Sequence, residues 1–137
     1  MNPENGVVDG RAPVMRVPAT PQAANAGGDI FGGWLMGQID IAGSIPAVLL
    51  AKGRVVTAAV NYINFRKPLY IGDMVNLYAE VSRVGHTSIG INVEVIAQRH
   101  RDGEIETVAV ADAGLTYVAV DADGKPRPVP ERLHPAG

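Results

Sequence analysis

Cysteine is absent from the 137 residues of this chain. Disulfide bonds, thiolate metal sites and a cysteine nucleophile are therefore excluded, and nothing in the composition indicates an oxidising compartment. A strong charge of either sign is absent as well, because the formal net charge is -2 at pH 7. Neither nucleic acid nor an anionic membrane surface is expected as a partner.

Long apolar runs and targeting signals are also scarce. The longest apolar run, residues 45–51, is far shorter than the roughly 20 residues that a membrane-spanning helix needs. The first residues, M-N-P-E-N-G, lack the basic and apolar regions of a signal peptide. A soluble cytoplasmic protein is the simplest interpretation.

Several catalytic signatures are missing from the sequence. There is no G-x-S-x-G motif, which argues against a serine hydrolase. The glycine-rich turn before Trp34 is not followed by G-K-S/T and is not part of a strand-loop-helix pattern with a later acidic residue. It is therefore neither a Walker loop nor a dinucleotide fingerprint. The three scattered histidines, His86, His100 and His134, do not make a metal site, and we expect neither a metal nor a cofactor.

Residues 25–52 stand out because they combine a glycine-rich turn with a long apolar segment. They read N-A-G-G-D-I-F-G-G-W-L-M-G-Q-I-D-I-A-G-S-I-P-A-V-L-L-A-K. A helix that is apolar on all sides is normally buried. Asp40, the one charged residue between Asp29 and Lys52, is therefore expected inside a core. A carboxylate there must be hydrogen-bonded, protonated or retained for chemistry.

Glycine, proline and charged residues mark the ends of this helix. We expect it to begin near residues 32–33, with Asp29 as its cap, because glycines and an acidic residue suit a helix N-terminus. Pro46 removes one backbone hydrogen bond and clashes with the preceding turn, which predicts a kink or an early end just before it. The Lys-Gly pair at residues 52–53 supplies the stop.

After the helix, the apolar pattern changes to period two, which is typical of half-buried strands. Asp102-Gly103 is a strong hairpin signal, and Gly114 suggests a bulge or bend. The order of elements predicts an α+β fold, in which an antiparallel sheet packs one face against a single helix. The first strand belongs at a sheet edge because prolines flank it, and long open edges favour dimerisation. We expect strands at residues 14–17, 54–65, 74–84, 88–98 and 104–120.

The length of the chain fits one domain with its own core. Polar and turn-forming residues dominate both ends of the sequence. We expect residues 1–10 to be a disordered N-terminal tail, residues 11–122 to form the single domain, and residues 123–137 to be a C-terminal tail.

Seven sequence motifs carry a resemblance to a known family. The segment P-x-x-A-N-A-x-G-D-I-F-G-G-W-L-M-x-Q-I-D-x-A-G resembles the opening of the hotdog-fold acyl-CoA thioesterases, in particular the bacterial YciA type, whose relatives include the brain cytosolic acyl-CoA hydrolase. The match continues through R-V-V-T-A-A-V, N-F-R-K-P, I-G-D-M-V, G-H-T-S-I, I-N-V-E-V and T-Y-V-A-V-D-A-D-G-K-P-R. It covers residues 14–128, which is nearly the whole chain.

The resemblance implies a hotdog fold, with one long central helix wrapped by an antiparallel sheet and two such units paired into one continuous sheet. It also implies hydrolysis of acyl-CoA to a free acid and CoA, without a metal, at active sites in the dimer interface. Coenzyme A then enters only as part of the substrate and product. A further assembly of three dimers into a hexamer is expected.

Asp40 and Asn25 are the candidate catalytic residues. From the residues alone, Asp40 is either a catalytic group or a core carboxylate bonded to Ser44 or to the backbone, and Asn25 is a turn residue. The resemblance places the family's catalytic acid at Asp40 and its partner asparagine at Asn25, supplied by the neighbouring subunit. Asp40 can act as a general base or as a nucleophile, and both roles stay open.

Two further groups of residues are candidates for substrate contacts. The backbone N–H groups of Gly32 and Gly33 at the helix start can stabilise the negative charge that develops on the thioester oxygen. Phe31 and Trp34 are expected to be packing residues, and one of them, Phe31 as the candidate, can line the acyl channel. Residues near strand ends and turns are candidates for the CoA nucleotide, although each alone is more often a solvated surface residue: Arg54, Thr57, Arg66, Lys67, Arg83, His86, Thr87 and Ser88.

Two other functions compete with the thioesterase hypothesis. A hotdog dehydratase or hydratase would use a histidine with a carboxylate, but no histidine lies within residues 25–52. A non-catalytic acyl-CoA-binding protein is the second alternative, and the presence of both Asp40 and Asn25 weighs against it.

Overall fold

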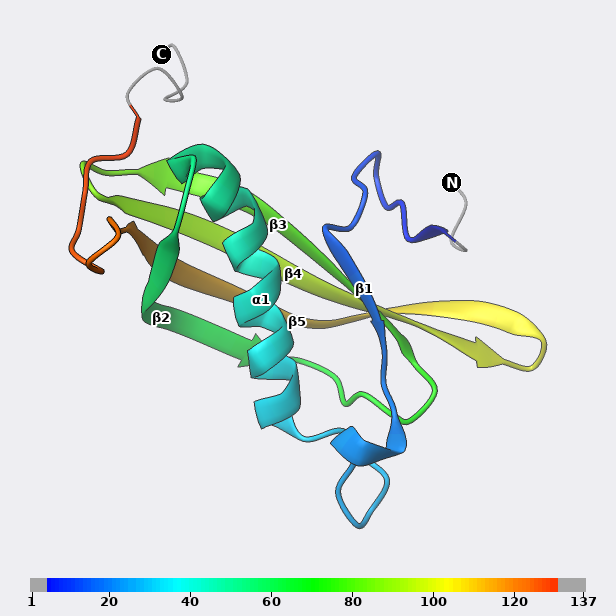
Figure 1. The fold of residues 1–137 in the computed structure, drawn as a ribbon. Coiled ribbons are helices and arrows are strands. Elements are labelled where there is room, and N and C mark those ends of the chain that lie inside the picture. The colour runs from blue at the N-terminus through cyan, green and yellow to red at the C-terminus, as the bar shows by residue number, and fades with distance from the viewer. Residues whose placement is uncertain (1–4, 131–137) are drawn as a thin grey trace.

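The computed structural model describes residues 5–130 and contains one long helix and five strands (Figure 1). The expected α+β fold is confirmed. The bounds of the third expected strand match the structure, and each other strand differs by one to three residues at one or both ends. In chain order the elements are β1 (Met15–Pro18), the short 3-10 helix η2 (Pro21–Ala23), α1 (Gly32–Ala51), β2 (Val55–Phe65), β3 (Met74–Val84), β4 (Ser88–Arg101) and β5 (Glu104–Ala119).

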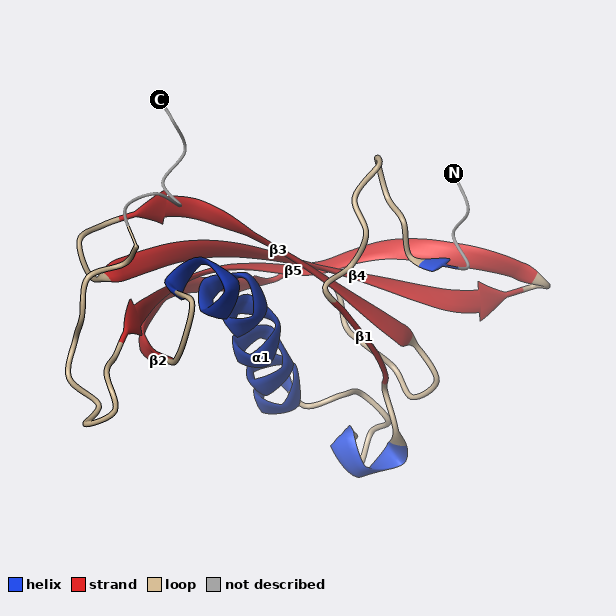
Figure 2. Cartoon of the chain, turned by 45° about the horizontal axis from the view of Figure 1, so that its top comes forward, coloured by secondary structure: helices blue, strands red, loops and turns tan. Residues whose placement is uncertain are grey.

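The five strands form one antiparallel sheet in the order β1-β3-β4-β5-β2. The helix α1 lies across one face of this sheet (Figure 2). The short strand β1 is at one edge, as its flanking prolines predict, and the much longer β2 is at the other. The hairpin between β4 and β5 turns at Asp102 and Gly103, both with positive φ, so the Asp-Gly signal is also confirmed.

The core forms where the apolar face of the sheet meets α1. Alternate residues of β4 point into this core, which confirms the period-two pattern. Every second side chain from Ile89 to Ala97 is at most 2% exposed. The helix contributes the residues of a single face to the same cluster: Leu35, Ile39, Ala42, Ala47 and Ala51.

The helix is not buried on all sides, so that expectation is wrong for the protomer. Leu49 is 73% exposed, and Ile41, Ile45 and Val48 are also exposed. The reason is that a single sheet covers one side of a helix and leaves the opposite side without a partner. By length and composition α1 would suffice to cross a membrane, but its buried face packs on the sheet like the core helix of a soluble protein.

The ends of α1 differ from the expectation in two places. The helix continues through Pro46 to Ala51, because proline removes only one N–H group and the following turn still packs in the core. Asp29 does not cap the helix. Phe31 is the N-terminal cap residue, and no side chain bonds there. The C-terminal stop is confirmed, since Lys52 has left-handed dihedral angles and ends the helix.

Gly114 lies opposite a bulge, as the sequence predicts, although the extra residue is in β2: the register shifts between Val60 and Tyr62, and Tyr62 pairs with Gly114. The pairing of β2 with β5 shifts register at two places in β2, and the pairing of β4 with β5 shifts at Val110. Gly114 also makes room for an aromatic ring, because a Cβ atom there would lie 2.5 Å from Cε1 of Tyr62.

The N-terminal segment 5–10, which the sequence assigns to a disordered tail, packs on the sheet face opposite α1. Gly6 is buried, and its carbonyl accepts a hydrogen bond from the hydroxyl of Tyr78. Beside it, Arg16 donates to Asn76 and Gln98, at 2.7 and 3.0 Å. These bonds explain why two polar residues of the outer face are buried.

The first part of the C-terminal tail also makes defined contacts. The guanidinium of Arg127 donates to the carbonyl of Ala51 at 2.8 Å and to that of Val120 at 3.1 Å. The tail therefore ties the end of α1 to the end of β5. His134 lies outside the described residues.

Candidate active site

Asp40 lies in the middle of α1 and is half-buried rather than enclosed in the core. Its carboxylate oxygen Oδ1 accepts a hydrogen bond from Thr57 Oγ1 at 2.6 Å and one from the Tyr117 hydroxyl at 3.2 Å. The alternative in which Asp40 pairs with Ser44 is wrong, because the Ser44 hydroxyl donates to the carbonyl of Ile41.

Thr57 and Tyr117 reach Asp40 together because they are paired across the sheet. They lie opposite each other where β2 pairs with β5, so their side chains project from the same face, towards α1. Thr57 therefore belongs with Asp40, and its contact with the CoA nucleotide stays a prediction. Asp40, Thr57 and Tyr117 are called the acid half-site below.

Tyr117 is a buried residue that the sequence analysis missed. Its single hydroxyl proton is shared between two acceptors, the backbone carbonyl of Asp40 at 2.7 Å and Oδ1 at 3.2 Å. Burial, and then the neighbouring Asp40 carboxylate, raise the pKa of Tyr117 well above its ordinary value, so the hydroxyl remains a donor. One signal was available, because Tyr117 falls on the apolar face of the last strand and a buried tyrosine hydroxyl needs a partner.

Asn25 lies in the loop before α1 and shapes that loop with its own side chain. Asn25 Oδ1 accepts hydrogen bonds from the backbone N–H groups of Gly27 at 2.9 Å and Asp29 at 3.2 Å. The interpretation as a turn residue is therefore confirmed. The loop is fixed further along, where the N–H of Ile30 donates to the carbonyl of Leu69 at 3.0 Å.

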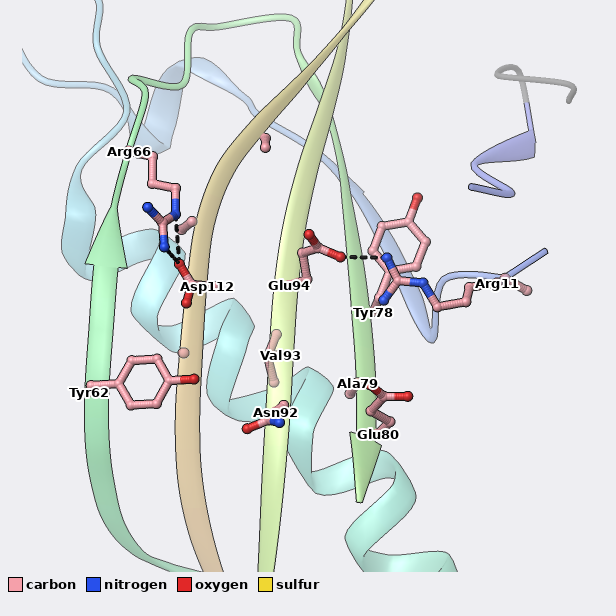
Figure 3. Close-up of a pocket in the computed structure, with 14 residues that line it drawn as sticks. Arg11, Tyr62, Arg66, Tyr78, Ala79, Glu80, Asn92, Val93, Glu94 and Asp112 are labelled. Atoms are coloured by element: carbon pink, nitrogen blue, oxygen red, sulfur yellow. Dashed lines mark hydrogen bonds and ion pairs between the residues drawn. The ribbon is translucent and has the colours of Figure 1, made fainter. Parts of the chain in front are cut away.

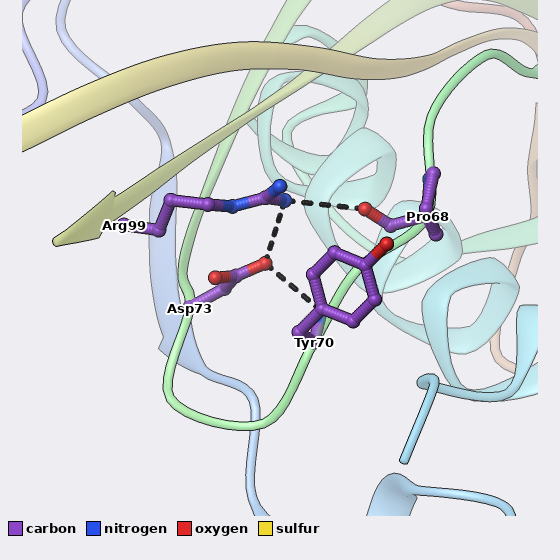
Figure 4. Close-up of polar contacts among 4 residues, drawn as sticks. All are labelled: Pro68, Tyr70, Asp73 and Arg99. Atoms are coloured by element: carbon purple, nitrogen blue, oxygen red, sulfur yellow. Dashed lines mark hydrogen bonds and ion pairs between the residues drawn. The ribbon is translucent and has the colours of Figure 1, made fainter. Parts of the chain in front are cut away.

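A buried ion pair holds the segment to which this loop is bonded (Figure 4). Arg99 Nη2 and Asp73 Oδ2 are 2.8 Å apart, and their side chains are only 16% and 4% exposed. Asp73 Oδ2 also accepts from the N–H of Tyr70 at 2.9 Å, and Arg99 donates to the carbonyl of Pro68 at 3.1 Å. The pair thus fixes residues 68–73, which include the partner of Ile30. No sequence pattern identified Arg99.

The start of α1 presents two glycines beside an exposed aromatic side chain. A Cβ atom on Gly33 would meet no atom within 4 Å, and one on Gly32 would lie 3.5 Å from the Phe65 ring. Phe31 is exposed. The first N–H groups of a helix have no partner within the helix, so those of both glycines point outwards. Asn25, Gly32 and Gly33 are called the loop half-site below.

The two half-sites are separated within one protomer. Asp40 lies eight residues after Gly32, which is roughly 12 Å along the helix axis at a rise of 1.5 Å per residue. The Asn25 side chain is turned into its own loop. One protomer therefore does not bring Asp40 and Asn25 together.

The residues suggested for the CoA nucleotide are likewise split between distant places. The N–H of Lys67 donates to Val110 near the middle of β5, whereas the carbonyl of Arg54 accepts from Val120, just beyond the C-terminal end of that strand. Ten residues of strand separate those positions, which is roughly 30 Å. One protomer therefore brings only part of the set together. The turn between β3 and β4 lies at the Arg54 end, and the turn with the strand ends beside it contains Arg83, His86, Thr87 and Ser88.

A cavity of about 560 Å³ lies on the sheet face away from α1 (Figure 3). Its arginines are paired with carboxylates, because Arg11 contacts Glu94 and Arg66 lies 2.7 Å from Asp112. It contains neither half-site. Among residues 5–130, no group of three or more histidine, aspartate or glutamate side chains is placed to hold a metal ion.

The sequence and fold both match known thioesterases. Residues 27–104 match the thioesterase superfamily. The acyl-CoA thioester hydrolase YciA of Salmonella typhimurium is 48% identical over 118 residues, which are 85% of this chain and 89% of that protein. A hexameric hotdog-fold thioesterase of Campylobacter jejuni superimposes with a TM-score of 0.85 at 43% identity, over 88% of this chain and 92% of that one.

An acyl-CoA hydrolase of Staphylococcus aureus is similar as well, with a TM-score of 0.76 at 34% identity over 85% of this chain and 70% of that one. That protein has been crystallised with butyryl coenzyme A and coenzyme A, and as variants in which an asparagine, an aspartate or a threonine is replaced by alanine. Those three residues are separated by 15 and 17 positions. Asn25, Asp40 and Thr57 have the same spacing.

Proposed function

Because this chain belongs to the thioesterase superfamily and has the hotdog fold of its relatives, we infer that it hydrolyses acyl-CoA to a carboxylic acid and CoA. The single observation that carries the assignment of the site is the Asp40 carboxylate, which Thr57 and Tyr117 hold in the middle of α1. The spacing shared with the Staphylococcus aureus hydrolase supports the same residues.

Asp40 has two chemically complete roles in this reaction. As a general base, it takes a proton from water while the water oxygen attacks the thioester carbonyl. The C–S bond then breaks, and the CoA sulfur leaves and is protonated. As a nucleophile, Asp40 attacks the carbonyl itself, and the C–S bond breaks as CoA leaves and is protonated. Water then hydrolyses the resulting anhydride to the free acid and restores the Asp40 carboxylate. Thr57 orients the carboxylate in either case.

The loop half-site supplies what the acid half-site lacks. The charge that develops on the carbonyl oxygen needs donors in place, and the N–H groups of Gly32 and Gly33 are unobstructed by side chains. Asn25 orients the water or the carbonyl, and Phe31 contacts the acyl chain. Because the half-sites are separated within one protomer, we propose that Asp40 of one subunit works with Asn25 of its neighbour.

The exposed apolar side of α1 and the edge strand β2 are the surfaces that support this dimer. β2 has 11 residues and pairs on one side only, whereas the other edge strand has four residues and is flanked by prolines. Val60 of β2 is exposed as well, and its pairing with the core residue Leu115 places it on the sheet face towards α1. A second copy would bury this surface, and the hexameric relative supports assembly of three such dimers.

The chemistry above requires no metal and no cofactor, and we place the protein in the cytoplasm.

The purified protein should release free thiol from a panel of acyl-CoA substrates of increasing chain length, with the same rate after exhaustive chelation. Thiol release measured with a thiol-reactive dye checks this. A folded protein that binds acyl-CoA and releases no thiol at any chain length would be a binding protein. If chelation lowers the rate of thiol release and a divalent ion restores it, the protein is a metal enzyme.

The variant Val60→Lys should convert the assembly to inactive monomers, because it places a charge in the apolar surface that the second copy covers. Light scattering and the thiol-release rate are measured on the same sample. Asp123→Lys is the matched control, since it introduces a lysine in an exposed turn after β5. An active monomer at assay concentration would refute an active site shared between subunits.

A further inference from the structure

We propose that Tyr117 is a positioning residue that, together with Thr57, holds oxygen Oδ1 of Asp40 and leaves Oδ2 as the reacting oxygen. The inference rests on the proposed thioesterase function and assigns separate roles to the two oxygens of the carboxylate. It gives Tyr117 no contact with the substrate. Its effect on the reaction passes through Asp40 alone.

The two hydroxyl groups converge on one oxygen. Thr57 Oγ1 donates to Oδ1 at 2.6 Å, and the Tyr117 hydroxyl, which shares its proton with the Asp40 carbonyl, lies 3.2 Å from the same oxygen. No described residue donates to Oδ2. The two oxygens of a free carboxylate are equivalent, and rotation of the group exchanges them. Here a rotation would break both hydrogen bonds, so the carboxylate keeps one orientation. Because both donors come from the sheet, Oδ2 is left turned away from them.

Tyr117 is itself held in place, which allows it to position another group. Its side chain is fully buried, and its hydroxyl is anchored to the backbone carbonyl of Asp40 at 2.7 Å. This bond to the backbone does not depend on the conformation or the identity of the side chain at residue 40. The hydroxyl is therefore fixed relative to the helix before the carboxylate is oriented.

Gly43 provides the space for this contact one turn further along α1. A Cβ atom at that position would collide with the Tyr117 hydroxyl and lie 3.1 Å from Cζ of the ring. A glycine inside a helix costs stability relative to alanine, so its presence needs a reason in packing. The close approach of Tyr117 supplies that reason. Burial also keeps the hydroxyl protonated by raising the pKa of Tyr117, which suits a donor and not a base.

The variant Tyr117→Phe tests the proposal because it removes the hydroxyl and keeps the ring. We expect kcat to fall about tenfold or more, as for the loss of a hydrogen bond to a charged group, with KM changed by less than about twofold. Tyr78→Phe is the matched control, since its buried hydroxyl also bonds to a backbone carbonyl, that of Gly6, on the opposite sheet face. Its kcat should equal that of the wild type.

Three outcomes of this experiment decide between the possibilities. If Tyr117→Phe has wild-type kcat while Asp40→Asn is inactive, the positioning role is wrong and the proposed function stands. If Tyr78→Phe loses as much kcat as Tyr117→Phe, the effect is one of general packing, which also overturns the role. If Asp40→Asn is fully active, the proposed site and the role of Tyr117 fail together.

A double variant checks that Tyr117 acts through Asp40. In the Asp40→Asn background, Tyr117→Phe should cause no further loss of the residual rate, because the group it positions is no longer a carboxylate. A further loss as large as that in the wild-type background would show that Tyr117 acts independently of Asp40, and would overturn the proposal.

Discussion

The variants Asp40→Ala and Asn25→Ala should each lose about 10²- to 10⁴-fold in kcat, the range expected when a general base or its partner is removed. If Asp40 is the base or nucleophile, nothing else in the acid half-site can replace it, because Thr57 and Tyr117 only donate hydrogen bonds to it. Thiol release at saturating acyl-CoA measures the effect.

Both variants should remain folded. Alanine at position 40 favours the helix, and the backbone carbonyl of residue 40 continues to accept from the Tyr117 hydroxyl. Thr57 is exposed and can donate to water instead. Circular dichroism and thermal unfolding provide the control. An Asp40→Ala protein that keeps wild-type kcat would contradict the assignment of the acid.

The variant Asp73→Ala should destabilise the protein by about 3–5 kcal/mol, because it leaves the buried guanidinium of Arg99 without its carboxylate. The N–H of Tyr70 loses its acceptor at the same time. Residues 68–73 hold the loop that contains Asn25. When kcat is measured at a temperature well below the unfolding temperature, it should therefore also be lower than that of the wild type. Urea denaturation followed by circular dichroism measures the loss of stability.

Asp112→Ala is the matched control for this prediction. It removes the carboxylate of the pair with Arg66, whose side chains are 56% and 31% exposed, and such a pair contributes only about 0–1 kcal/mol. Equal losses for the two aspartate variants would show that the Arg99 pair has no special role in holding the segment.

The parts of the fold that the sequence predicted correctly are those set by burial of one face. The inner face of β4 follows a period of two from Ile89 to Ala97, because the strand packs that side on α1. The Asp-Gly hairpin and the Lys-Gly helix end are equally local, since a positive φ favours particular residues. Such features require no knowledge of which elements meet in space.

The parts that were wrong or missed depend on contacts between distant elements. Thr57 and Tyr117 are 60 positions apart, and only the register of β2 with β5 places both beside Asp40. The helix was expected to be buried on all sides because its composition is apolar all round. Composition does not show whether the sheet of the same chain or a second subunit buries each side. Similarly, the residues suggested for the CoA nucleotide were grouped because they lie near strand ends, although the sheet places Lys67 and Arg54 far apart.

The most direct test of the shared active site is to mix the two inactive variants. A heterodimer of Asn25→Ala and Asp40→Ala subunits, isolated with two affinity tags, has one site with both residues replaced and one with both intact. It should recover about half of the wild-type dimer's kcat, because each active site takes Asp40 from one subunit and Asn25 from the other. A heterodimer that forms, is folded and remains inactive would contradict the shared site and show that the two residues act within one chain.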